Sequence, residues 1–231
     1  MKPGEFIFNG QSSTKFNTLM QVRPARGEGA RSFTESAPSN RNGSVFWDLG
    51  VYNNFELDLH CFARIQKATD LDDLIDWLNT ADYVDLKLYY DDQYTYKAIC
   101  KNSVPFQAYA ADHEYYDFTI NLSVHPFKYL DTGLKQLSGT SLQVTNTTKY
   151  EAHPLITVTG KGDTTLTINA DQTYTFKGLS GTITIDSEVP SCSLPAKYAG
   201  LEFPYLKTGL NTIKTSGTGL TIIPRFVRRA V

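Results

Sequence analysis

The sequence of 231 residues has no apolar run approaching the ~20 residues that a membrane-spanning helix needs. Its opening residues, Met1 to Glu5, are not followed by the apolar core of a signal peptide, so we expect a chain made and kept in a cytosol. It also lacks an excess of positive charge, with 22 Lys and Arg against 24 Asp and Glu. This balance disfavours nucleic-acid binding by bulk electrostatics.

Cysteine is scarce as well. Cys61, Cys100 and Cys192 show no CxxC or Cys/His spacing, which excludes a disulfide framework and predicts buried thiols in a reducing compartment. No GxSxG, Walker, GxGxxG or HExxH motif occurs. The four histidines are scattered without metal-ligand spacing: His60, His113, His125 and His153. We therefore expect no catalytic residue, no cofactor and no metal.

Aromatic and apolar residues are abundant, at 13% and 41% of the chain. Strands are predicted where apolar and polar residues alternate, as in Phe55 to His60, or where strand-forming residues are bounded by turns. In the first half these are 6–8 before an Asn-Gly turn, 18–22 as its possible partner, 55–60, the hairpin 84–99, and 116–124. Residues 24–44 read as a long loop, with a hairpin possible around Arg31 to Phe33.

One helix is predicted. Leu71, Leu74, Ile75 and Leu78 recur at helical spacing and make one apolar stripe, and Thr69 or Asp70 would serve as the N-cap.

Aromatics thin out at residues 131–141, where we place a domain boundary, giving domains 1–134 and 135–231. Beyond it, short alternating strands are predicted at 156–159, 166–168, 174–176, 183–185, 211–213 and 220–223. Turns are expected between them at 160–163, 169–172 and 178–181. The expected fold is mainly β: an N-terminal β-sandwich with one α-helix and a β-hairpin, then an antiparallel β-sandwich.

Eight aspartates lie between positions 70 and 92. Paired carboxylates among them could serve a glycan hydrolase. Their positions on a helix face and in a hairpin turn indicate instead that the carboxylates are solvated.

Large aromatics beside a long loop are candidate contact residues, and edge strands invite pairing with another chain. The loop 24–54 and the hairpin 84–99 are the candidate subunit interfaces, through Arg41, Trp47, Tyr52, Tyr94 and Tyr96.

Several segments, in order, resemble the distal tail protein (Dit) family of siphophages that infect Gram-positive bacteria. In the first half these are FIFNG at 6–10, a PGRxG-like PSNRNG at 38–43, the helix with Trp77, YTYKA at 94–98, and HPFKY at 125–129. The second half is more specific: PLITVTGKGD at 154–163, ITIDSE at 183–188, FPYL at 203–206 with GLNTI at 209–213, and PRF at 224–226. In the PSNRNG segment Ser39 stands where the family has glycine, and one residue is inserted.

The resemblance implies a non-enzymatic hub of the virion: a homo-hexameric ring built by the first domain and a galectin-like second domain. Its implied partners are the tail tube protein, a Tal-like tail-tip protein and receptor-binding or baseplate proteins, with DNA only in transit and no membrane insertion. If the acid-rich segment 70–92 faced the lumen, it would repel DNA and let it slide. The alternative is a host-surface carbohydrate-binding module. Galectin-type sugar ligands are missing, however, since His153 is followed by Pro154 and Leu155 and both tryptophans lie in the first half.

Overall fold

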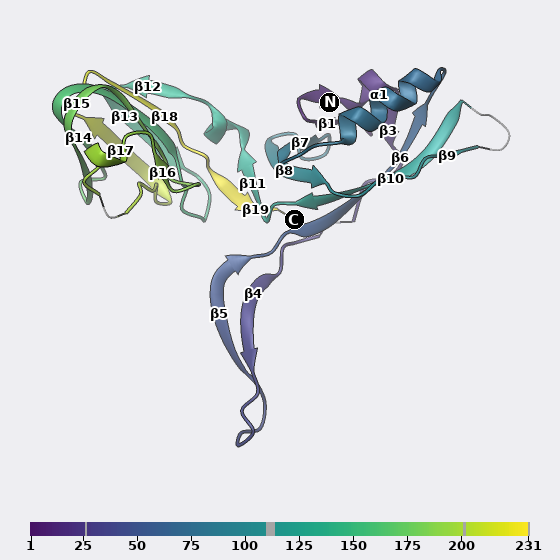
Figure 1. Cartoon of the computed structure of the whole chain (residues 1–231), viewed down its shortest axis with the longest axis horizontal. Coiled ribbons are helices and arrows are strands. Elements are labelled where there is room, and N and C mark those ends of the chain that lie inside the picture. The colour runs from purple at the N-terminus through teal and green to yellow at the C-terminus, as the bar shows by residue number, and fades with distance from the viewer. Residues whose placement is uncertain (26, 110–113, 201, 231) are drawn as a thin grey trace. The chain divides into compact units, whose positions relative to one another are not determined.

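The computed structural model describes residues 1–25, 27–109, 114–200 and 202–230. His113 lies outside this range. The chain forms two compact units, Met1–Lys128 with Arg229–Val231, and Tyr129–Arg228. The predicted mainly β fold is confirmed: strands arranged in antiparallel sheets dominate both units, and the described residues contain one α-helix (Figure 1). None of the helices in the described part of the chain is long and apolar enough to span a membrane.

Unit 1 is built on a ten-stranded sheet whose main path runs β2-β1-β7-β8-β10-β6-β3. The strands of this sheet in unit 1 are β1 (Phe6–Phe8), β2 (Gln11–Ser12), β3 (Thr18–Met20), β6 (Phe55–Arg64), β7 (Val84–Leu88), β8 (Tyr94–Cys100), β9 (Gln107–Ala108) and β10 (Tyr115–Val124). The sheet also contains β11 (Phe127–Leu130) and β19 (Val227–Arg229), which lie where the chain passes from one unit to the other.

The alternation of apolar and polar residues explains the central pair of this sheet. Leu57 and Leu59 of β6 are buried, as are Ile120 and Leu122 of β10, which they directly oppose.

Two expectations about this sheet are corrected. The strand at 18–20 pairs with β6 instead of β1. The hairpin 84–99 forms as predicted, but β7 lies between β1 and β8, so it is no sheet edge.

Helix α1 (Ala68–Leu78) confirms the predicted helix, with two differences. Lys67 occupies the N-cap position, and Asp70 accepts hydrogen bonds from the backbone N–H groups of Gln66 and Lys67 at 3.3 and 3.1 Å. This carboxylate thus acts from inside the first turn. The buried face consists of Leu74, Trp77 and Leu78, whereas Ile75 is 44% exposed.

Trp77 fixes α1 against the sheet. Its indole stacks on Phe16 of the short 3-10 helix η1 (Ser13–Phe16), with ring centres 4.4 Å apart, and contacts Phe6 and Phe8 of β1. Its Nε1–H donates to the Phe8 carbonyl at 2.8 Å. A buried indole must satisfy this donor, so the bond sets the register of helix against strand.

Unit 2 is a seven-stranded antiparallel sheet folded onto itself. Its elements are η2 (Asp131–Leu134), β12 (Leu137–Gly139), β13 (Ser141–Asn146), β14 (Leu155–Ile168), β15 (Gln172–Asp186), β16 (Ser191–Cys192), η3 (Pro195–Lys197), β17 (Gly209–Thr215) and β18 (Gly219–Ile223).

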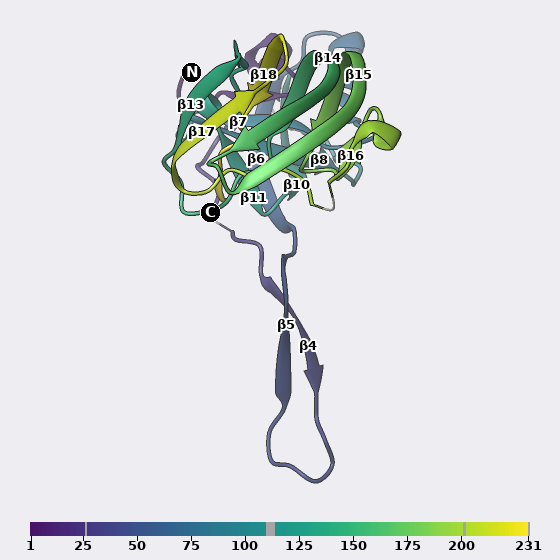
Figure 2. The same ribbon diagram turned by 90° about the vertical axis from the view of Figure 1, so that its left-hand side faces the viewer.

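The strands β14 and β15 run side by side through both layers of this unit (Figure 2). The first half of β14 pairs with β18 and its last residues pair with β17, so the strand passes from one layer to the other. A register shift between Gly162 and Thr164 and the positive φ of Gly181 (103°) lie where the strands bend. The turns predicted at 160–163 and 178–181 are therefore wrong: glycines there bend continuous strands. The turn at 169–172 is confirmed.

The two layers enclose a core of aliphatic and aromatic side chains. Fully buried members come from both halves of the bent strands, as expected for a sandwich. They include Ile156, Val158, Leu166, Ile168, Phe176, Ile183, Ile185, Leu206, Ile213 and Ile222.

Candidate interaction surface

Within unit 1, β4 (Arg31–Ser36) and β5 (Val45–Tyr52) form a separate two-stranded hairpin that extends from the ten-stranded sheet (Figure 1). We call residues 31–52 the hairpin arm. The sequence predicts a long loop over residues 24–44, with a hairpin possible around Arg31 to Phe33. The strands in fact reach Ser36 and Tyr52.

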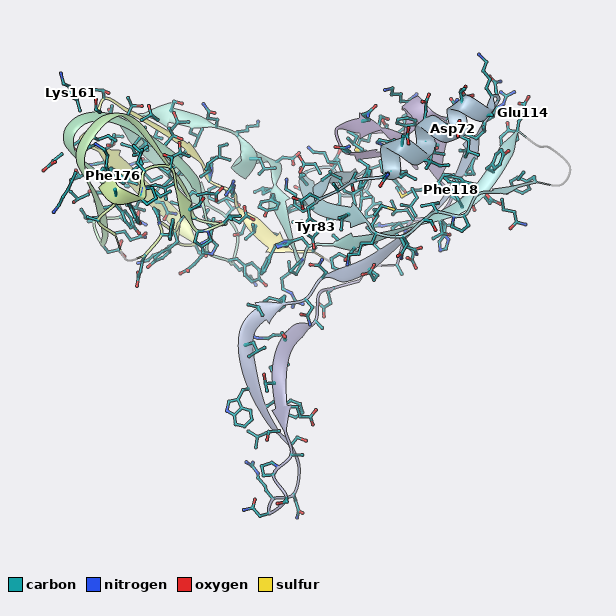
Figure 3. All side chains as sticks on the ribbon, in the orientation of Figure 1. Asp72, Tyr83, Glu114, Phe118, Lys161 and Phe176 are labelled. Carbon is teal, nitrogen blue, oxygen red and sulfur yellow. The ribbon has the colours of Figure 1, made fainter. Side chains whose placement is uncertain are left out.

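The arm carries apolar side chains on both of its faces. Strand pairing sets Phe33 opposite Asp48 and Glu35 opposite Phe46, so these four share one face. Thr34 lies opposite Trp47, which therefore projects from the other face. Side chains project to both sides of the arm in Figure 3.

These apolar groups are strongly exposed in the single chain. The exposed fractions are 61% for Phe46, 53% for Trp47 and 51% for Phe33, and Leu49 and Val51 reach 54% and 55%. The Phe33 and Phe46 rings contact only edge to face, with centres 6.4 Å apart. A two-stranded ribbon is marginal in water, and large apolar side chains gathered on one exposed segment commonly mark a contact surface. The arm therefore has the composition of a contact surface.

One ion pair lies between the two strands of the arm. Arg31 Nε donates to Asp48 Oδ1 at 2.8 Å, and the Gly50 N–H donates to the same oxygen at 2.9 Å. The hydrogen bond from Arg31 and that from Gly50 lower the pKa of the Asp48 carboxyl. Both partners are well exposed, so the pair aligns the strands and adds little stability.

The root of the arm, at Tyr52, packs against other residues of unit 1. The Tyr52 ring lies edge-on to Phe127, with centres 5.6 Å apart, and the Arg229 guanidinium lies 4.6 Å from the Tyr52 ring centre. Arg229 also pairs with Glu28 at 3.0 Å and donates to the Gly29 carbonyl at 3.0 Å. These contacts fix where the arm begins.

The expected interface residues separate into two groups. Arg41 lies in the exposed loop that closes the arm, Trp47 lies on β5, and Tyr52 lies at the root. Tyr94 and Tyr96 are 6% and 3% exposed within unit 1. In the single chain the two tyrosines are therefore core residues.

Tyr94 and Tyr96 enclose the charge of Lys128, which the sequence pattern does not reveal. Lys128 Nζ lies 2.5 Å from Asp91 Oδ2 and 3.1 Å from the Tyr96 hydroxyl, which itself donates to Asp91. The same ammonium lies 4.6 and 5.1 Å from the centres of the two tyrosine rings. The Lys128 side chain is only 9% exposed, so the carboxylate and rings replace its lost hydration.

The acid-rich segment 70–92 does not converge on a site. Asp70 supports the start of α1, Asp85 pairs with Lys97 at 2.6 Å, and Asp91 pairs with Lys128. Asp72, Asp73 and Asp76 are exposed on α1. Within the described ranges, no three His, Cys, Asp or Glu side chains gather closely enough to hold a metal ion.

Unit 2 contains one partly buried ion cluster. Arg225 donates to both carboxylate oxygens of Asp186 at 2.6 and 3.1 Å and pairs with Glu188 at 3.2 Å, while Tyr129 donates to Glu188. Burial raises the pKa of Asp186, but hydrogen bonds from Arg225 and backbone N–H groups outweigh it, and the net pKa is lowered. This arrangement is a structural clamp.

Sugar-binding sites usually contain an exposed aromatic ring on which the sugar stacks. In the described part of unit 2, no aromatic side chain is strongly exposed. Tyr174, Phe176, Tyr198 and Phe203 pack against one another. In the described part of this unit, the strongly exposed large apolar side chains are aliphatic: Leu137, Val189 and Leu210.

No protein-family profile matches the sequence, and no curated protein matches it significantly. The three-dimensional structure, in contrast, is similar to a solved one. The crystal structure of the Dit protein (gp 19.1) of phage SPP1, described as a paradigm of the hub adsorption apparatus in phages that infect Gram-positive bacteria, superimposes with a TM-score of 0.66 at 15% sequence identity. The similarity covers 98% of this chain and 99% of that one, so the chain has a Dit-like fold over its whole length.

Proposed function

We propose that this chain is a non-enzymatic hub of a phage tail tip, a member of the Dit family that acts by assembling with copies of itself and with other tail proteins. The Dit-like fold over the full length of both chains supports this assignment. The ordered family-like segments of the sequence support it independently of the structure.

The exposed apolar side chains of the hairpin arm are the observation that best supports a role in assembly. Its exposed Phe46 and Trp47 need a partner surface. A closed ring needs a heterologous interface, in which one patch of each subunit binds a different patch of the next. An arm that extends from unit 1 suits the donor side of such a contact, and we propose a homo-hexameric ring made through unit 1.

The remaining assignments rest on the resemblance of the sequence to the Dit family and on the Dit-like fold. We propose that its neighbours are the tail tube protein, a Tal-like tail-tip protein and receptor-binding or baseplate proteins, with unit 2, proposed to be galectin-like, on the outside. The protein would be made in the host cytoplasm and reside in the virion. A chain with a net charge of −2 would release few counterions on meeting DNA, which suits a lumen through which DNA slides.

The test is the mass and shape of the purified full chain. We expect light scattering to give a concentration-dependent oligomer and electron microscopy to show six-fold rings. The double variant Phe46→Ser/Trp47→Ser should remain folded, because both side chains are exposed, and should stay monomeric. The control Val189→Ser removes an exposed apolar side chain of unit 2, 68% exposed, and should assemble normally.

A wild-type chain that stays monomeric at high concentration would contradict the proposal. So would a hydrolytic activity on cell-wall glycan that is lost when one carboxylate is changed.

A further inference from the structure

A groove of about 390 Å³ lies beside α1 in unit 1. The helix contributes Ile75, Leu78 and Asn79, and the segment from Cys100 to Phe106 forms the opposite wall. Ile75 belongs to the apolar stripe of the helix but is 44% exposed. The groove is thus partly apolar, with Ile75, Leu78, Val104 and Phe106 beside the polar Asn79, Lys101, Asn102 and Ser103. Its volume falls in the ~300–1,000 Å³ range that holds whole small molecules.

Acidic side chains flank this groove on one side. At 3.6 residues per turn, Asp72 and Asp76 lie on the helix edge next to Ile75 and Asn79, whereas Asp73 lies toward the other edge. Asp72 is labelled on α1 in Figure 3. No Lys, Arg or His occurs from Ala68 to Leu86. The opposite wall contributes the cation Lys101.

The outer part of the hairpin arm has the complementary features. Phe46 and Trp47 provide large exposed apolar groups, and an indole or phenyl ring is small enough for the groove. Between Ser36 and Trp47 the only charged residue is Arg41. Glu35 lies on the same face of the arm as Phe46, so it is the acid that matches Lys101 when Phe46 enters the groove. Arm and groove therefore complement each other in both apolar character and charge.

We propose that the groove beside α1 receives the hairpin arm of a second copy of this chain, with Trp47 or Phe46 inserted next to Ile75 and with Arg41 facing Asp72 and Asp76. This inference rests on the proposed ring, for which it names the acceptor side of the subunit contact. Arm and groove are two different patches of unit 1, as a heterologous contact requires.

Cross-linking tests which surfaces meet. The full chain carrying Trp47→p-benzoylphenylalanine is mixed with ¹⁵N-labelled wild-type chain, assembled and irradiated. We expect mass spectrometry to find cross-links between isotopically different chains in peptides that contain Ile75 to Asn79 or Cys100 to Phe106. Oligomers whose cross-links map elsewhere would overturn the groove assignment and leave the proposed ring intact.

Charge reversal tests the pairing independently. Arg41→Glu should weaken self-association about fivefold, as loss of a rim ion pair does. Adding Asp72→Arg should restore it. The matched control is Arg41→Glu with Asp73→Arg, because Asp73 is equally charged and exposed but lies toward the other edge of the helix.

The variants should all show wild-type circular dichroism, because the changed side chains are exposed. Equal self-association of the Asp72 and Asp73 double variants, measured by sedimentation, would overturn the proposed pairing. A wild-type chain that shows neither self-association nor cross-links between chains would overturn the ring and the groove together.

Discussion

The buried Lys128 ammonium lies 4.6 Å from the centre of the Tyr94 ring. Its only full countercharge among the described contacts is Asp91, itself 18% exposed at the side chain. Replacing Lys128 by Ala would leave that carboxylate partly buried without its cation. We expect Lys128→Ala to lower the free energy of unfolding by about 2–4 kcal/mol, measured by urea denaturation.

The matched control for Lys128 is Lys97→Ala. Lys97 forms the same kind of ion pair with Asp85, at 2.6 Å, but both side chains are well exposed. Its loss should cost less than about 1 kcal/mol. Equal costs for the two variants would show that burial of the Lys128 pair is energetically unimportant.

Gly181 allows β15 to bend. Its φ of 103° is one that residues with a Cβ rarely adopt, although a Cβ there would meet nothing within 4 Å. Gly181→Ala should therefore lower the free energy of unfolding by about 1 kcal/mol or more through backbone strain alone. In β18, Gly219 has no positive φ, and a Cβ added there would lie 3.6 Å from Thr159 Cβ, an ordinary contact, so Gly219→Ala should be neutral or slightly stabilising. Chemical denaturation of both variants compares the two, and equal destabilisation would contradict the account.

The same bend marks a limit of prediction from the sequence. Alternation of apolar and polar residues located β6, β7, β10 and parts of β14, β15, β17 and β18, because one face of each is buried, but it missed most of β4 and all of β5 and β13. The pattern of glycines at 160–163 and 178–181 could not distinguish a turn from a bent strand, since both need residues that tolerate unusual φ. β14 continues as a bent strand because β17 and β18 pair with its two different halves. These pairings join residues far apart in the sequence, so a local pattern cannot predict them.

The expected contact residues differ in exposure for a similar reason, and their role in an interface stays a prediction. Arg41 and Trp47 were chosen because they lie in or beside a long loop, and both are exposed in the single chain. Tyr94 and Tyr96 looked equally suitable in a hairpin, but both are buried in unit 1, where they enclose Lys128, a residue that pairs with Asp91 across 37 positions of sequence. The exposure of Ile75 could not be predicted either. The helical spacing of apolar residues locates a helix, but it does not show which neighbouring segments cover the apolar face of that helix.

Acid should destabilise unit 2 through Asp186. The pKa of this carboxyl in the folded chain is lowered from its ordinary 3.8, so the ionised form is favoured by folding. The stabilisation is complete above that ordinary value and is lost as the pH falls through the lowered pKa of the folded state. Asp186→Asn should lower the melting temperature at pH 7 and flatten its decline below about pH 4. An unchanged acid limb of the melting curve would show that other carboxyls dominate.

Cys100 provides a native reporter of the groove. It lines the groove and is half-buried, whereas Cys61 is fully buried in β6. Burial raises the pKa of both thiols, that of Cys61 to about 12. Because the thiolate is the reactive form, Cys61 should resist maleimide until the chain unfolds, and Cys100 should react slowly in the monomer.

Assembly should change only one of these rates. If the arm of a second copy covers the groove, labelling of Cys100 should slow in wild-type oligomers relative to the monomeric Phe46→Ser/Trp47→Ser variant. Cys192, in unit 2, is the internal reference because it lies outside both arm and groove. Slowing of Cys192 alone would place the subunit contact on unit 2, and equal slowing of Cys100 and Cys192 would indicate general shielding, so only a selective effect at Cys100 agrees with arm binding.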